Sequence, residues 1–120
     1  MAYEVKMFYE NYYSGTLTDA LLYHKVFSDL KDAIKKFESL RKQISDKDEW
    51  MKIRGRVKEL ELVELHPKDF ADGFAFFDKF TSAESLYFCG MTLNTSYGFD
   101  YEDVHVYIAD PETNEVVVRS

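Results

Sequence analysis

The sequence has little of what a secreted or membrane protein needs. It contains one cysteine, Cys89, so no disulfide can form within the chain, whereas small secreted domains usually rely on several. No apolar run approaches the roughly 18 residues that a membrane span requires. The first ten residues include Glu4, Lys6 and Glu10, where a secretory signal would have an unbroken apolar stretch. We therefore expect a cytoplasmic protein without membrane contact.

Motifs of common enzymes and cofactor sites are also missing. The sequence has no glycine-rich nucleotide or phosphate loop, no zinc-ligand spacing and no G-x-S-x-G nucleophile elbow. Cys89 lies between Phe88 and Gly90 in an apolar stretch, where a thiol behaves as an inert, small hydrophobic group. We therefore expect no enzymatic activity, no cofactor and no bound metal ion.

What is present indicates a globular protein. The 120 residues are 46 % hydrophobic and 31 % charged, and a chain of this length is too short for two independent cores. No repeat, low-complexity stretch or linker interrupts it. We expect a single domain over residues 1–120.

The first half of the chain carries the clearest periodicities. Residues 3–13 alternate between apolar and charged side chains, which predicts a half-buried strand, and residues 17–27 follow a turn and predict the returning strand of a hairpin. From Ser28, a helix cap, to Ile44 the apolar residues recur at helical spacing: Leu30, Ile34, Phe37, Leu40 and Ile44. This pattern predicts a helix over residues 28–44.

The second half is less regular. Residues 46–56 are compatible with helix, loop or strand, and residues 57–65 favour a strand. Pro67 and the spacing of Phe70, Phe74 and Phe77 predict a second helix over residues 67–81. We expect strands at 86–93, 104–108 and 116–118, a loop at 94–103 and a turn at 110–114.

The predicted order is β-β-α-β-α-β-β-β. Hairpins at both ends favour a mainly antiparallel sheet with the two helices packed on one face. The fold class expected from the sequence is therefore α+β.

Charge is divided unevenly along the chain, whose net charge is −7. Residues 31–58 hold ten Lys or Arg against five acids, and residues 59–115 hold thirteen acids against two lysines. The acidic part also contains four of the nine tyrosines, a residue type enriched in binding surfaces. Each half thus suits an oppositely charged partner.

The favoured hypothesis is a non-enzymatic binding or inhibitory protein that engages the basic surface of another protein. Phage-encoded inhibitors of host defence act in this way, and that comparison is one of type, not of motif. Self-association is a further option, because the two halves are oppositely charged, whereas nucleic acid is not expected as a partner of so acidic a chain. The residues expected at the interface are Tyr97, Asp100, Tyr101, Glu102 and Asp103.

The alternative hypothesis is a binder of nucleotides or other small phosphorylated ligands. If residues 52–58 are extended, they place four cations along one face of a strand, next to an aromatic side chain suited to stacking. The same cations could instead protect a sheet edge or pair with acids. The residues of this alternative site are Trp50, Lys52, Arg54, Arg56 and Lys58.

A third hypothesis, weaker than the other two, is a metal-dependent enzyme. Asp100, Glu102, Asp103 and His105 offer three carboxylates and an imidazole, which suit a hard divalent ion. They lack a glycine-defined ligand loop, and a solvated acidic loop is the simpler interpretation.

Overall fold

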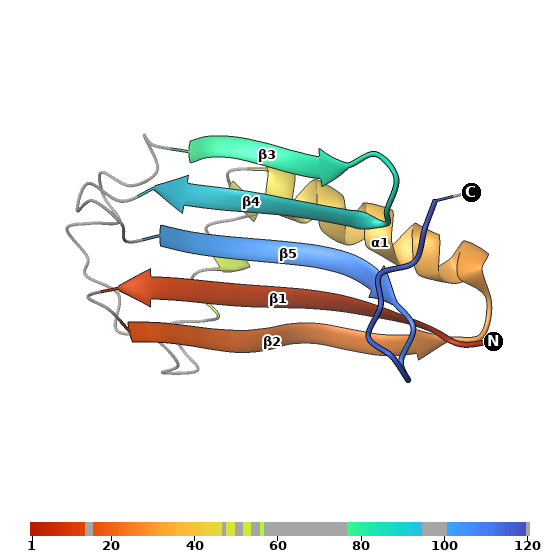
Figure 1. Cartoon of the computed structure of the whole chain (residues 1–120). Helices are drawn as coiled ribbons and strands as arrows, with labels where there is room; N and C mark the ends of the chain where they lie inside the picture. Colours follow the sequence, from red (N-terminus) through yellow and green to blue (C-terminus); the bar gives the residue numbers. More distant parts are fainter. Residues whose placement is uncertain are drawn as a thin grey trace.

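The computed structural model describes residues 1–13, 16–46, 48–49, 52–53, 56, 77–94 and 101–119. Its elements are β1 (Tyr3–Tyr13), β2 (Thr16–Phe27), α1 (Leu30–Ser45), β3 (Phe77–Ala83), β4 (Phe88–Asn94) and β5 (Tyr101–Ala109). The five strands form one sheet in the order β2-β1-β5-β4-β3, and every neighbouring pair is antiparallel. Figure 1 shows α1 crossing behind this sheet, along one of its faces. An antiparallel α+β fold is thus confirmed, and α1 is the one named helix in the described part of the chain.

The hairpin of β1 and β2 follows the predicted alternation. Val5, Met7 and Tyr9 are buried against α1, whereas Lys6 and Phe8 are half-buried on the other side of the sheet. The pairing with β2 shifts register between Met7 and Phe8. Such a bulge changes the phase of alternation along β2, so residues on both sides of it can still present a consistent face to the core.

The first helix forms where its apolar stripe predicts it, but its cap differs from the expected one. Asp29, not Ser28, is the N-cap: its backbone is extended and its Oδ1 accepts a hydrogen bond from the Lys31 amide at 2.9 Å. An ionised carboxylate at this position also complements the helix dipole, which a serine cannot do. The residues of α1 that are buried are Ala33, Phe37, Leu40 and Ile44.

The prediction of a second helix over residues 67–81 is wrong at its C-terminal end. Residues from Phe77 onward form β3, which pairs with β4. The close spacing of phenylalanines favoured a helix, but pairing across a sheet supplies both hydrogen bonds and side-chain contacts that local spacing cannot reveal. Residues 67–76 lie outside the described residues, as does the strand predicted at 57–65.

The C-terminal part departs from the prediction in two places. Tyr101, Glu102 and Asp103 belong to β5 and not to the predicted loop at 94–103. The strand predicted at 116–118 is reduced to isolated bridges, Ala109 with Val116 and Leu86 with Val118. The predicted turn is confirmed: Asp110 Oδ1 accepts a hydrogen bond from the Glu112 amide at 2.8 Å.

The core lies between α1 and the inner face of the sheet. Val104, Val106 and Ile108 of β5 are fully buried, and Phe37 of α1 packs edge-on against Tyr87, with ring centroids 6.0 Å apart. Cys89 is buried in the same cluster, and this burial raises the pKa of its thiol to about 12. The thiol therefore stays protonated and unreactive near neutrality, as expected from its apolar neighbours. No helix among the described residues has the length and apolar character needed to cross a bilayer.

Candidate functional site

The acidic residues predicted at a partner interface fall on opposite faces of β5. The side chain of Glu102 is only 1 % exposed, points into the core and accepts a hydrogen bond from the Tyr9 hydroxyl. Asp103 and His105 lie on the other side of the strand, because successive side chains of a strand alternate. Glu102 thus contributes to the interior, and a partner at the surface would meet Asp103.

The structure describes little of the other residues predicted at that interface. Tyr97 and Asp100 lie outside the described residues. For Tyr101 the structure describes the backbone, which pairs with Tyr12 of β1 and Asn94 of β4. Their role in binding stays a prediction.

Two basic residues of the alternative site are described, and neither has an extended backbone. Lys52 and Arg56 are exposed and have a helical backbone. The Lys52 ammonium lies 3.0 Å from the carboxylate of Glu49, and this hydrogen bond raises the pKa of Lys52. The strand arrangement is therefore wrong for these two residues, because Lys52 pairs locally along a helical segment. Trp50, Arg54 and Lys58 lie outside the described residues.

The face of the sheet opposite α1, termed the open face, carries a line of carboxylates. Glu10 in β1 is directly opposite Asp19 in β2 on one side and Asp103 in β5 on the other. These three residues, termed the acid row, come from three adjacent strands. Like charges directly opposite one another destabilise a sheet, so this arrangement favours a cation above it.

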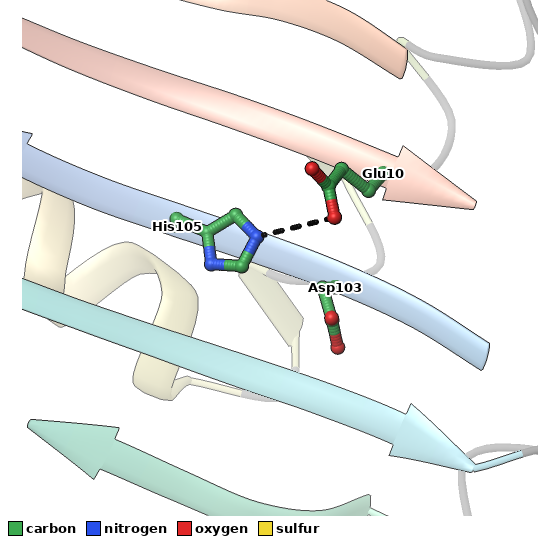
Figure 2. Close-up of side chains that lie close together, drawn as sticks. All are labelled: Glu10, Asp103 and His105. Carbon is green, nitrogen blue, oxygen red and sulfur yellow. Dashed lines mark ion pairs between the residues drawn. The ribbon is translucent and has the colours of Figure 1, made fainter. Parts of the chain in front are cut away.

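An imidazole lies next to the acid row. The Nε2 atom of His105 is 3.7 Å from a carboxylate oxygen of Glu10, and Figure 2 shows the Glu10 side chain directed toward the His105 ring. One ligand atom from each of Glu10, Asp103 and His105 lies within 4.8 Å of the others. The Oδ1 atom of Asp103 is enclosed and has no hydrogen-bond partner among the described residues. Two carboxylates and an imidazole can bind either an organic cation or a divalent metal ion.

A shallow cavity of about 380 Å³ adjoins the acid row on the open face. Its walls combine aromatic rings with a few polar groups, and we term it the aromatic hollow. The Phe88 ring lies 5.9 Å from the His105 ring, at 32° to it, so the two rings form part of one surface. The residues that line the hollow are Lys6, Phe8, Glu10, Phe88, His105, Tyr107 and Asn114.

Gly90 is a buried glycine beside His105 in the sheet. It lies in β4 directly opposite His105, and it has no side chain to fill the space above the strand. A glycine inside a strand often marks a place where a ligand or another chain approaches the backbone closely.

Two cations of the open face, Lys6 and His24, lie opposite each other at the far end of the β1–β2 hairpin, away from the acid row. Lys6 Nζ donates a hydrogen bond to Asn114 Oδ1 at 3.0 Å and lies 3.4 Å from the Glu4 carboxylate. His24 of β2 also contacts Glu4, at 3.6 Å. Both groups are therefore engaged with Glu4 or Asn114, whereas His105 contacts the acid row through Glu10. Lys79 of β3 lies opposite Thr92, the β4 partner of Asp103.

A second cavity, of about 370 Å³, lies between α1 and the β3–β4 turn. It contains Glu38 and Glu84 together with Arg41 and Arg119, so its charges balance. Arg119 is already engaged: its Nε donates to the Leu86 carbonyl at 2.9 Å and its guanidinium lies 4.8 Å from the centre of the Tyr87 ring. This cavity therefore shows less preference for a charged ligand than the open face does.

Comparisons with known proteins give no template for either cavity. No protein-family model, curated protein or solved structure matches this chain.

Proposed function

We propose that this protein is a non-enzymatic binding protein that engages a basic surface of another protein through the open face of its sheet. The acid row provides the charge, and the adjacent aromatic hollow provides apolar contact area. Of the interface residues predicted from the sequence, this proposal retains Asp103. It replaces Glu102, which is buried, with Glu10 and Asp19.

The observation that carries the proposal is the register of β2, β1 and β5. It aligns Asp19, Glu10 and Asp103 across three strands. Opposed like charges cost an isolated sheet about 0.2–1 kcal/mol for each pair. A basic partner would remove this repulsion on binding, so the same residues that weaken the free protein would strengthen the complex.

Such binding would make the protein an inhibitor wherever the covered basic surface is itself functional, for instance a channel for nucleic acid. The protein would compete there as an acidic substitute for the phosphate backbone. Nucleic acid itself is a poor candidate partner, because it would meet the acid row with charge of the same sign.

The test compares capture of partners by matched variants. Three proteins are immobilised on a support and incubated with native cell extract. They are the parent protein, a double variant Glu10→Gln and Asp103→Asn, and a control double variant Glu112→Gln and Glu115→Gln. The control residues are exposed acids of the 110–115 turn, so both double variants lose the same charge. Mass spectrometry identifies the retained proteins.

We expect a basic protein that the parent and the control retain and the acid-row variant loses. Its retention should fall with added salt, since surface attraction is screened over about 8–10 Å at physiological ionic strength. Equal retention by all three proteins would refute the proposal. Loss on Arg56→Glu, together with a co-purifying phosphorylated compound, would instead favour the alternative ligand site.

A divalent metal ion is the second candidate occupant of the acid row, because Glu10, Asp103 and His105 form a set of three neighbouring ligand groups. Metal binding to the folded state would raise the melting temperature, in proportion to the logarithm of metal concentration well above Kd. Addition of Mn²⁺ or Zn²⁺ to the parent and to His105→Ala tests this directly. A rise confined to the parent would assign a metal site, and equal responses would exclude His105 as a ligand.

A further inference from the structure

We propose that the aromatic hollow receives a single arginine side chain of the partner, with its guanidinium group at Glu10. This inference rests on the proposed function and specifies the chemistry that the open face recognises. It follows from the order in which aromatic, acidic and basic groups are arranged along the hollow.

The two ends of the hollow differ in charge. Lys6 and Glu10 are four residues apart on β1, which separates them by about 13 Å along the strand. Lys6 pairs across the sheet with Tyr107, whereas Glu10 pairs with Asp103. A cationic group entering the hollow therefore meets a lysine that is already paired with Glu4 at one end, and the carboxylates of Glu10 and Asp103 at the other.

The middle of the hollow suits the stem of a long side chain. Phe8, Phe88 and Tyr107 line it with aromatic surface, and Gly90, which has no side chain, pairs with His105. The methylene groups of an arginine or lysine can lie on such rings while the charged end stays in contact with water. The aromatic faces add a favourable interaction with the cation itself.

The acid end favours guanidinium over ammonium. Glu10 and Asp103 together offer several carboxylate oxygens, and Oδ1 of Asp103 has no hydrogen-bond donor among the described residues. A guanidinium has five N–H donors in a fixed plane, so it can bind carboxylates with two parallel hydrogen bonds and stack on a ring at the same time. The protein already uses this chemistry on its other side, where the Arg119 guanidinium lies over the rings of Phe37 and Tyr87.

The test titrates three short peptides into the isotope-labelled protein and follows its backbone amides by NMR. The peptides are acetylated and amidated Gly-Ser-Xaa-Ser-Gly, in which Xaa is arginine, lysine or citrulline. Citrulline keeps the size and planarity of arginine without its charge. Because this comparison needs no change to the protein, it does not depend on whether a variant folds.

We expect the arginine peptide to shift the amides of Gly90 and His105 and to saturate. The citrulline peptide should bind at least about tenfold more weakly, and the lysine peptide should lie between the two. Glu10→Gln should reduce arginine binding to the citrulline level, whereas Glu112→Gln in the exposed turn should leave it unchanged.

Three results would overturn the inference. Equal binding of arginine and citrulline would remove the role of charge, and equal binding of arginine and lysine would remove the role of the planar group. Displacement of the arginine peptide by an equimolar amount of Mn²⁺ would assign the acid row to a metal ion instead.

The outcomes also separate this inference from the proposed function. If no peptide binds while capture of a basic protein still depends on Glu10 and Asp103, the proposed function stands and the arginine pocket fails. If the arginine peptide binds while capture is indifferent to these residues, the proposed function fails and an arginine-binding hollow remains.

Discussion

At the scale of single residues, Tyr9 and Glu102 form a polar contact inside the core. Both side chains are at most 1 % exposed, and the Tyr9 hydroxyl donates to Glu102 Oε1 at 2.5 Å. A buried carboxylate that loses a donor keeps the full cost of its desolvation. This pair therefore matters more for stability than its surface counterparts do.

We expect Tyr9→Phe to lower the free energy of unfolding by about 1–3 kcal/mol, the range for leaving a buried polar group without its hydrogen-bond partner. Denaturation by urea measures the change. Tyr3→Phe is the matched control, because the Tyr3 hydroxyl contacts Met1 at the surface, and we expect it to cost less than about 0.5 kcal/mol. Equal stability of Tyr9→Phe and the parent would contradict the proposed weight of this contact.

Cys89 makes stability depend on pH in the alkaline range. Burial raises the pKa of its thiol from the ordinary value of 9.0 to about 12 in the folded protein. Between these values the unfolded chain releases a proton that the folded chain keeps, so the folded state is stabilised less as pH rises.

We predict that the parent loses about 1.4 kcal/mol more stability than Cys89→Ala between pH 8 and pH 10, because one pKa unit corresponds to about 1.4 kcal/mol. Urea denaturation of both proteins at the two pH values measures the difference. Subtracting the change in the variant from the change in the parent cancels the contributions of other titrating groups. The same burial should make Cys89 resist iodoacetamide at pH 8 until urea unfolds the protein. Parallel pH profiles of the two proteins would show that the thiol ionises freely.

The sequence predicts some of these residue positions and misses others for a physical reason. The alternation of Val104, Val106 and Ile108 indicates that they face the core, and its extension by one step would have placed Glu102 inside as well. An acid is seldom buried, so the sequence alone gives little reason to place Glu102 in the core. Glu10 gave no signal of its own, because its importance depends on which residues of β2 and β5 lie opposite it.

At the scale of elements, the start of α1 differs by one residue from the start expected from the sequence. Ser28 and Asp29 are both good N-caps, and the structure assigns the cap to Asp29. We expect Asp29→Ala to cost about 1 kcal/mol and Ser28→Ala to cost much less. Thermal melts followed by circular dichroism measure both, and a larger loss in Ser28→Ala would return the cap to Ser28.

Elements with a consistent local pattern are the ones that the sequence predicts. The strands at 3–13 and 17–27 and the helix at 28–44 each show one period over their whole length, and the structure places β1, β2 and α1 within two residues of these bounds. The segment at 67–81 mixes phenylalanines at helical spacing with residues that pair in β3. Which pattern prevails there depends on β4, a partner that local sequence does not specify.

At the scale of the whole molecule, the open face combines acids that repel one another. We predict that Asp19→Asn stabilises the free protein by about 0.2–1 kcal/mol at low salt, since Asp19 lies directly opposite Glu10. The gain should shrink as salt increases, because screening weakens the repulsion. Melting temperatures of this variant and of Glu112→Asn, an exposed turn residue used as a control, provide the measurement. Destabilisation by Asp19→Asn would indicate that Asp19 has a favourable contact instead.

Charge along the chain and charge in space turn out to be different properties. The sequence predicts an acidic C-terminal half, yet two of the three members of the acid row, Glu10 and Asp19, come from the N-terminal hairpin. The antiparallel pairing of β1 with β5 brings the hairpin beside the acidic segment. Strand register, which composition cannot supply, therefore decides where the acidic site lies.

The strand order β2-β1-β5-β4-β3 also has a consequence for synthesis in the cell. β1 is made first, but its neighbour β5 is made fifth among the described strands, so β1 waits for it for several seconds at translation rates of about 5–20 residues per second. During that interval the β1–β2 hairpin and α1 can form, while the other edge of β1 has no partner strand. During synthesis the chain therefore has an unpaired strand edge that later lies in the middle of the sheet. Folding without aggregation requires this edge to be covered until β5 has left the ribosome.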